Sequence, residues 1–288
     1  MRYPGTWLYV PGDRPDRMSK AMVSGAEVVV LDLQDAVAMS RKQQARATVA
    51  EFLTAAEPAP WAPRIHVRVN NVHTETGRRD LDAVAGLPAL AGIRLPRVEA
   101  PADIESAIRV VGTGGAGAGF HCLIETAAGV ENAYRIAAIP GVAAISLGEG
   151  DLRAELRALD EQALEWTRSR IVVAAAAAQL PPPAMAVFGN IKDAAGLRES
   201  CERGRRLGMR GRAAIHPAQL PIIAEAFAPT AAEVEQARRI VTEADAHAGG
   251  FALDDGTFVD QPVVAAARLT LEWAERYQPS SARGRDHE

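Results

Sequence analysis

The chain has 288 residues, of which 48% are hydrophobic and 24% are charged, and its formal net charge is −4. These values are typical of a globular protein, and the lack of a basic block interleaved with aromatic residues argues against a nucleic acid partner. The N-terminal stretch reaches Pro4 and Gly5 before any long apolar run, which argues against a secretory signal or a membrane span.

Eight short apolar runs, rich in β-branched residues, alternate with segments of helical pattern. The predicted strands are 6–10, 28–33, 64–70, 92–98, 121–126, 143–148, 184–189 and 213–217. Alternation of strands and helices indicates βαβ units and a parallel sheet. Eight such units predict an α/β fold, a TIM (β/α)8 barrel that occupies residues 1–220. A doubly wound open sheet is the alternative.

The glycine-rich segment 112–120 superficially suggests a phosphate-binding loop. A dinucleotide fingerprint follows a strand and opens a helix, whereas this segment precedes a strand. We therefore interpret it as a connection between a helix and a strand.

Residues 221–278 are predicted to form a C-terminal extension. Thr230 precedes a helical run, Asp255 and Gly256 indicate a small hairpin, and 262–277 has the pattern of another helix. We expect an assembly arm or flap rather than an independent domain, followed by a disordered tail over 279–288.

Cys122 and Cys201 are the two cysteines, and they lie far apart without metal-ligand spacing. This predicts neither a disulfide framework nor a zinc ribbon. Two isolated thiols suit the reducing cytoplasm, which is the predicted location.

Polar residues gather where the predicted strands end, and no comparable cluster occurs where they begin. In a parallel barrel the carboxyl ends of the strands form the active-site mouth. The residues at these ends are Gln34, Asp35, Arg68, Asn70, Arg97, Glu99, Glu125, Gly148, Glu149, Asp151 and His216.

Glu125 and Asp151 follow consecutive strands and are the predicted metal ligands. Mg²⁺ prefers oxygen ligands and usually keeps several waters, so two carboxylates suffice. Helix capping or a salt bridge at a loop start is the alternative for both residues. Arg68, on a nearby strand, is predicted to bind a substrate carboxylate or to stabilise an enolate oxygen.

Two other polar residues have structural interpretations. Asp32 lies inside an apolar strand and is expected to satisfy neighbouring backbone or arginine groups. His121 precedes the apolar part of its strand, which places it at the wrong end for chemistry.

Nine motifs in order give the chain a resemblance to a known family. They are VPGDRPDRMSKA, VVVLDLQDAV, VRVN, LPRVE, LIETAAGV, LGEGDL, AIHPAQL, APTAAEVEQARRIV and FVDQPVVAAAR. The chain resembles the citrate lyase β-subunit-like proteins of the HpcH/HpaI aldolase superfamily over nearly its whole length. Any one motif is weak evidence, whereas nine in the same order are strong evidence.

The resemblance implies a TIM barrel with a C-terminal extension and a homotrimer or hexamer. It also implies Mg²⁺-dependent cleavage or formation of a carbon–carbon bond in a 3-hydroxyacyl thioester, such as a malyl, citramalyl or citryl thioester carried on CoA or an acyl carrier protein. The products are an acyl thioester and a 2-oxo acid.

The resemblance also assigns roles to residues. It implies that Glu125 and Asp151 hold Mg²⁺, that Arg68 binds substrate and stabilises the thioester enolate, and that Asp260 acts as acid or base in a neighbouring subunit's site. Asp35 joins the predicted catalytic residues. Gly148 and Glu149 are predicted, with Arg68 and Glu125, to contact substrate. Arg14, Arg17 and Lys20 are predicted to meet CoA phosphates, with a solvated helix start as the alternative.

One position departs from the family pattern. The family usually has Glu-Asp where this chain has Gln34 and Asp35. We expect the lost charge to weaken a contact that orients Arg68 or to alter which acyl group fits.

Three functions therefore follow from the sequence. The first is a stand-alone Mg²⁺-dependent lyase that acts on a 3-hydroxyacyl-CoA. The second is the β subunit of a multi-protein citrate lyase that acts on a carrier-protein thioester. The third is a non-catalytic protein that binds a 2-oxo acid or a CoA ester. The sequence leaves the acyl group and the direction of reaction open.

Overall fold

The structure is a computed structural model that describes residues 5–57, 59, 61–112, 118–247 and 249–277. Two predicted segments fall outside these residues: the tail 279–288 and most of the glycine-rich connection, at 113–117. Contacts divide the chain into two compact units, Met1–Ala226 and Phe227–Glu288.

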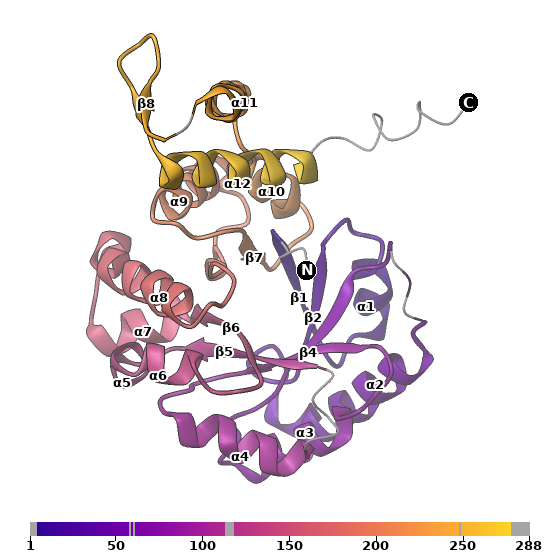
Figure 1. Ribbon diagram of the computed structural model, residues 1–288. Helices are drawn as coiled ribbons and strands as arrows, with labels where there is room; N and C mark the ends of the chain where they lie inside the picture. The colour runs from indigo at the N-terminus through magenta and orange to yellow at the C-terminus, as the bar shows by residue number, and fades with distance from the viewer. Residues whose placement is uncertain (1–4, 58, 60, 113–117, 248, 278–288) are drawn as a thin grey trace. The chain divides into compact units, whose positions relative to one another are not determined.

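The first unit is built on a curled sheet of seven parallel strands (Figure 1). Their order, β6-β5-β4-β3-β2-β1-β7, follows the chain and places the last strand beside the first. This order is that of a barrel and not of a doubly wound sheet, so the prediction of a TIM-barrel fold is confirmed. The strands are β1 (Thr6–Pro11), β2 (Val28–Asp32), β3 (Arg64–Arg68), β4 (Leu90–Leu95), β5 (Gly119–Ile124), β6 (Val142–Leu147) and β7 (Arg212–Ala214).

The predicted strand 184–189 was wrong as a strand, because the segment forms only one parallel bridge, from Met185 to Arg212. Its later carbonyl groups are bound by side chains instead. The Arg212 Nε donates to Ala186 O at 2.9 Å, and the Gln219 Nε2 donates to Phe188 O at 2.9 Å. These carbonyls are therefore not engaged in a ladder with a neighbouring strand.

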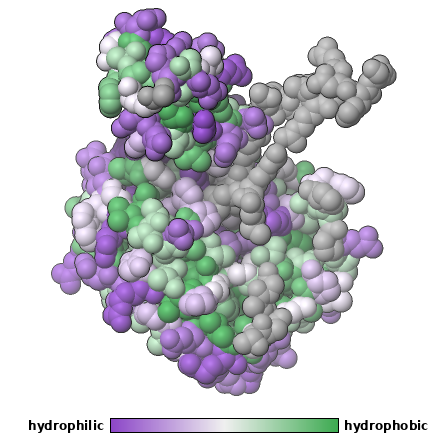
Figure 2. All heavy atoms as spheres, viewed as in Figure 1, coloured by the Kyte–Doolittle hydropathy of each residue, from purple (hydrophilic) through white to green (hydrophobic). Residues whose placement is uncertain are grey.

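The helices of this unit follow the strands. They are α1 (Pro15–Ala21), α2 (Lys42–Ala55), α3 (Glu75–Val84), α4 (Pro101–Val111), α5 (Ala127–Glu131), α6 (Ala133–Ala137), α7 (Glu149–Leu156), α8 (Glu165–Ala177), α9 (Ala194–Arg206) and α10 (Gln219–Phe227). Helices α2, α3 and α4 lie next to one another outside the sheet (Figure 1). Hydrophilic residues line much of the margin of this unit, including the edge where α4 lies (Figure 2).

The core lies on both faces of the strands. All five residues of β2 are buried, as expected for a parallel strand with a covered face on each side. Trp7, Val28, Val30, Ala184 and Ala213 form one buried apolar cluster.

A histidine pair lies near the amino-terminal end of the barrel interior. The rings of His66 and His121 have centroids 4.4 Å apart, and a Cβ at Gly92 would lie 2.7 Å from His66 Cε1. Burial, together with the charge of Arg94, lowers the pKa of His121 to about 3. The imidazole is therefore neutral, which agrees with the structural interpretation of His121.

The second unit contains two helices and a short hairpin. Thr230 directly precedes helix α11 (Ala231–Ala246) and caps it. Its Oγ1 accepts from the Glu233 N at 3.2 Å, so the predicted cap is confirmed. Strands β8 (Phe251–Ala252) and β9 (Phe258–Val259) form the predicted hairpin, and α12 spans Gln261–Tyr277. Residues of these elements, Ala237, Ile240, Leu253, Val259 and Ala267, form a buried cluster.

Two further features concern the whole of the described chain. Cys122 and Cys201 are buried, and both are free thiols. Among the described residues, no helix is both long enough and apolar enough to cross a bilayer.

We predict that Gly211 is required for closure of the sheet between β1 and β7. Its φ is +79°, and a Cβ would lie 2.2 Å from Gly5 O, which accepts from the Arg212 N. Gly211→Ala should therefore lower the free energy of unfolding by about 3 kcal/mol or more, as measured by urea unfolding.

The matched control is Gly86→Ala. Gly86 has a φ of +73° but no atom within 4 Å of the position of a Cβ, so its cost is that of the backbone alone, about 1 kcal/mol. Equal losses in the two variants would contradict the role of the close contact.

Candidate functional site

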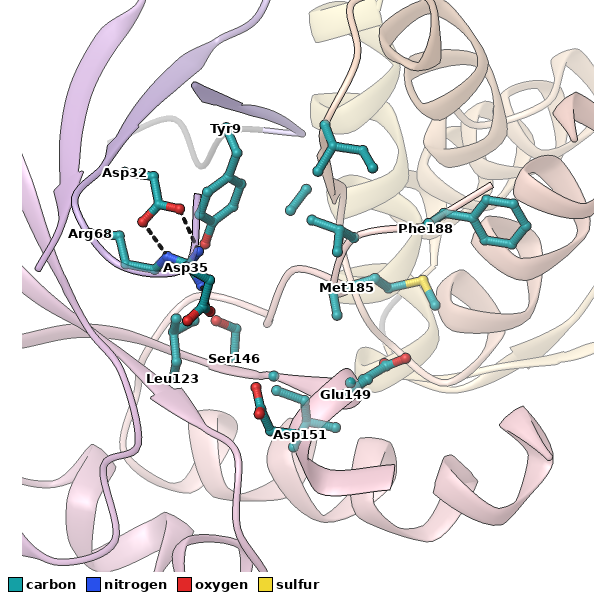
Figure 3. Close-up of a pocket in the computed structure, with 18 of the residues that line it drawn as sticks. Tyr9, Asp32, Asp35, Arg68, Leu123, Ser146, Glu149, Asp151, Met185 and Phe188 are labelled. Atoms are coloured by element: carbon teal, nitrogen blue, oxygen red, sulfur yellow. Dashed lines mark hydrogen bonds and ion pairs between the residues drawn. The ribbon is translucent and has the colours of Figure 1, made fainter. Parts of the chain in front are cut away.

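The carboxyl ends of the barrel strands surround a cavity of about 790 Å³. All seven strands of the sheet and the segment that begins at Met185 contribute residues to its lining, several of which are drawn in Figure 3. Of the predicted site residues, the cavity is lined by Arg17, Asp35, Arg68, Glu125, Gly148, Glu149 and Asp151.

Glu125 directly follows β5 and is 3% exposed. Its Oε2 accepts a hydrogen bond from the Arg97 N at 2.9 Å. Arg97 has a φ of +50°, a left-handed conformation that is costly for a residue other than glycine. On the other side, a Cβ at Gly148 would lie 2.2 Å from Glu125 Cγ, so the carboxylate fits only because residue 148 is glycine.

The environment of Glu125 opposes its ionisation. The pKa of Glu125 is raised to about 7. Burial is the largest cause and the neighbouring charge of Asp151 adds to it, while the hydrogen bond from the Arg97 N–H partly offsets the rise. A cation bound by the two carboxylates would stabilise their ionised forms and so offset both causes of the rise. The site therefore fits a positively charged ligand.

Asp151 lies in the first turn of α7, where the helix dipole favours a carboxylate. Its carboxylate is directed toward the interior of the cavity (Figure 3). No group of three or more His, Cys, Asp or Glu side chains in the described part of the chain has the arrangement of a metal site. The residues present therefore offer two carboxylates, and waters or a substrate would complete an octahedral shell.

Arg68 is fixed by two acids. Its Nε and NH2 donate to the Asp32 carboxylate at 2.8 and 2.6 Å, and its NH1 lies 3.4 Å from Asp35 Oδ2. Burial disfavours the charge, but the hydrogen bonds and charge of Asp32 outweigh it and raise the pKa of Arg68. Its guanidinium carbon lies 5.0 Å from the centroid of the Tyr9 ring. Arg68 is thus a permanent, oriented cation at the cavity wall.

Asp32 and Asp35 contact Arg68, whereas no contact joins Gln34 to it among the described residues, and the expected effect of the charge lost at position 34 stays a prediction. Gln34 is held through its backbone: its N donates to Asp32 Oδ1 at 2.9 Å, and its carbonyl accepts from Lys42 Nζ. Its Oε1 is buried and accepts no hydrogen bond from the described residues.

Glu149 borders the cavity, but its carboxylate is bound by Arg168. The Arg168 Nε and NH2 donate to it at 2.8 and 2.6 Å, and NH2 also donates to Glu161 at 2.6 Å. Ser200 links Glu161 to Arg212. This buried network fixes the start of α7 and hence Asp151. Arg168 lies 19 residues from Glu149 inside a helical pattern, and nothing in the sequence had marked it.

The predicted CoA-binding residues lie in different surroundings. Arg17 borders the cavity, whereas the Arg14 Nε and NH2 each donate to Asp16 at 3.0 Å. Lys20 lies in the last turn of α1 and does not line the cavity. Asp260 belongs to the second unit, where its Oδ1 accepts from the Val263 N at 3.2 Å and caps α12.

Comparison with known proteins identifies the family of the chain. Residues 6–217 match the family model described as HpcH/HpaI aldolase/citrate lyase. A (3S)-malyl-CoA thioesterase of Cereibacter sphaeroides is 37% identical over 275 residues, which cover 93% of each chain. A citrate lyase subunit beta-like protein of Mycobacterium tuberculosis is 34% identical over 282 residues, 94% of this chain and 95% of that one.

Solved structures are also similar. The protein CitE from Mycobacterium tuberculosis, in complex with magnesium, acetoacetate and coenzyme A, matches with a TM-score of 0.81 and 32% identity over 96% of this chain and 100% of that chain. A citrate lyase beta subunit from the same organism, complexed with oxaloacetate and magnesium, has a TM-score of 0.68 and 32% identity over 78% of this chain and 97% of that chain.

We predict that the buried charge of Glu125 costs stability in the metal-free protein. Its pKa is about 7 in the folded chain and has its ordinary value near 4.5 in the unfolded chain. The unfolded chain therefore loses its proton first, and stability is lost as pH rises from about 4.5 to 7. In chelator, Glu125→Gln should be more stable than the wild type at pH 8 by up to about 3 kcal/mol, and similar to it at pH 4.5.

Thermal unfolding at the two pH values measures this difference. Asp82→Asn, which removes an exposed carboxylate on α3, is the control and should show no such pH dependence. A difference between Glu125→Gln and the wild type that is the same at both pH values would show that the pKa of Glu125 is not raised.

Proposed function

Because the chain belongs to the HpcH/HpaI aldolase/citrate lyase family, we propose that it is a Mg²⁺-dependent carbon–carbon lyase. Its proposed substrate is a 3-hydroxyacyl-CoA thioester such as malyl-, citramalyl- or citryl-CoA, cleaved to or formed from an acyl thioester and a 2-oxo acid. The observation that carries this proposal is that Glu125, Asp151 and Arg68 all face one cavity at the mouth of the barrel.

Glu125 and Asp151 would hold Mg²⁺. The buried Glu125 and its repulsion from Asp151 support this assignment, as do the magnesium complexes of the similar CitE structures. When bound, Mg²⁺ would supply Lewis-acid polarisation and a template for the carboxylate and carbonyl of the 2-oxo acid.

Arg68 would stabilise the negative charge that develops on the thioester oxygen as the carbon–carbon bond breaks. Its ion pair with Asp32 holds the guanidinium in place before substrate arrives, so little reorganisation accompanies the reaction. Removal of such a donor costs on the order of 3 kcal/mol in the barrier. Asp35, which contacts the same arginine and is largely exposed, would adjust its position.

Cleavage also requires a group that removes the proton from the substrate hydroxyl. We propose Asp260 for this role, supplied by the extension of a neighbouring subunit in a homotrimer or hexamer. Its carboxylate caps α12 through one oxygen, which leaves the other free for proton transfer. Arg17, at the border of the cavity, would contact CoA, with Lys20 on the same helix and Arg14 directly before that helix.

Hydrolysis of a CoA thioester is a second candidate function. It is favoured by the identity of 37% to the (3S)-malyl-CoA thioesterase of Cereibacter sphaeroides. The same site would serve, with water as the attacking group on the thioester carbon. A lyase yields an acyl-CoA and a 2-oxo acid, whereas a thioesterase yields free CoA and a hydroxy acid.

We predict that Glu125→Ala and Asp151→Ala each abolish metal-dependent cleavage while the fold is retained, because each removes half of the protein's ligands. Malyl-, citramalyl- and citryl-CoA would be incubated with each variant and Mg²⁺, and the products identified by mass spectrometry. Asp82→Ala, which removes an exposed acid of α3, should retain wild-type activity.

Wild-type activity of either metal-site variant after chelation and return of Mg²⁺ would disprove the assignment. Cleavage of free CoA thioesters by the isolated protein would argue against a carrier-protein-dependent citrate lyase subunit. Tight binding of these ligands without turnover would instead identify a non-catalytic binding protein.

We predict that Asp260 acts across a subunit boundary. Asp260→Asn keeps an oxygen to cap α12 but removes the base, so this variant and Glu125→Ala should both be inactive. Mixed oligomers of the two, formed by coexpression, should regain a substantial fraction of wild-type activity, because some sites combine an intact Glu125 with an intact Asp260. Absence of recovery in verified mixed oligomers would place Asp260 outside a shared site.

A further inference from the structure

Arg94 on β4 is a second arginine of the same cavity, and the proposed reaction does not use it. It is 4% exposed, yet its side chain borders the cavity. Its Cα pairs in register with Arg68 on β3 and with His121 on β5. Its NH2 reaches β6, where it donates to Ser146 Oγ at 3.2 Å.

The charge of Arg94 lacks a counter-ion. Its Nε is buried and has no acceptor among the described residues, and it makes no ion pair there. By contrast, Asp32 neutralises Arg68, and two glutamates neutralise Arg168. The Tyr9 ring, 5.7 Å from the Arg94 guanidinium carbon, offers a favourable face but no negative charge.

The other titratable neighbours do not supply a negative charge either. Burial lowers the pKa of both His66 and His121, so these rings are neutral. The interior beside Arg94 is thus positively charged. An unpaired buried cation is costly, and such groups are typically paired when a site is complete.

The depth of Arg94 in the cavity defines what it can contact. Ser146, which its guanidinium reaches, pairs in register with Leu123 on β5. Glu125 lies two residues beyond Leu123, which corresponds to about 7 Å along a strand. Arg94 therefore lies one layer of side chains below the two carboxylates at the mouth.

We propose that Arg94 binds a second carboxylate of the substrate, so that the 2-oxo acid half is a dicarboxylate. This inference rests on the proposed function, in which the 2-oxo acid lies between Glu125 and Asp151. One carboxylate of the 2-oxo acid lies between Glu125 and Asp151. Its other carboxylate extends one layer deeper, where it meets the Arg94 guanidinium. Ser146 orients that guanidinium through the hydrogen bond to its NH2.

The test compares two ligands that differ by the second carboxylate. Binding of oxaloacetate and of pyruvate to the full-length protein with Mg²⁺ would be measured by calorimetry. The wild type should bind oxaloacetate at least about tenfold more tightly, as expected for a hydrogen bond between charged groups. Arg94→Met, similar in length but uncharged, should reduce oxaloacetate binding to the level of pyruvate and leave pyruvate binding unchanged.

Two controls separate this role from a structural one. Arg109→Met removes an exposed charge of α4 and should keep the preference. The melting temperature of Arg94→Met should equal or exceed that of the wild type, because the change removes an unpaired buried charge. A lower melting temperature with equal weakening of both ligands would overturn the proposal.

Equal affinity of the wild type for the two ligands would also overturn it. If CoA thioesters were nevertheless cleaved, the lyase assignment would stand and Arg94 alone would be misassigned. If the preference for oxaloacetate were present without turnover of any thioester, the lyase assignment would fail and the anion site would stand.

Discussion

The carboxylate of Asp32 is the group on which the geometry of the barrel mouth depends. It accepts two hydrogen bonds from Arg68 and one each from the Gln34 and Ala36 backbone N–H groups, at 2.9 and 3.1 Å. A buried carboxylate must be satisfied in this way, because desolvation without partners is costly. In satisfying it, the chain fixes both the loop after β2 and the direction of Arg68, the proposed catalytic arginine. A residue with a structural role therefore positions a group of the proposed reaction.

A second network holds the opposite side of the mouth. Glu149, Arg168, Glu161 and Ser200 connect the start of α7 to Arg212 on β7. Arg212 in turn binds the carbonyl of Ala186. The segment after Met185 is thus attached to the barrel largely by side chains, and the same side chains keep Asp151 in place. One side-chain network therefore joins the segment after Met185 to the start of α7, which carries a proposed metal ligand.

The sequence predicted what depends on local pattern. Seven of eight strands lie within a few residues of their predicted positions, because β-branched apolar runs form buried parallel strands. The convergence of Glu125, Asp151 and Arg68 was also predictable, because parallel strands bring their carboxyl ends to one rim.

What depends on contacts between distant residues was not predictable. The failure of 184–189 to form a strand follows from Arg212 and Gln219, which lie some 30 residues later and bind its carbonyls. Arg94 lies in the same run as Arg97, and only its burial without a counter-ion among the described residues distinguishes it. Asp260 lies in the second unit, and its role in a shared site is a proposal.

The hydrogen bond from Arg97 to Glu125 has a consequence for how this site tolerates mutation. The donor is a peptide N–H, so any residue that adopts a φ of +50° can provide it, and glycine or asparagine would do so with less strain than arginine. Position 97 is therefore free to vary while the contact persists. Position 148 is not, because any side chain there would displace Glu125. Comparison of sequences alone would rank position 97 as dispensable, although its backbone N–H holds Glu125, a proposed metal ligand.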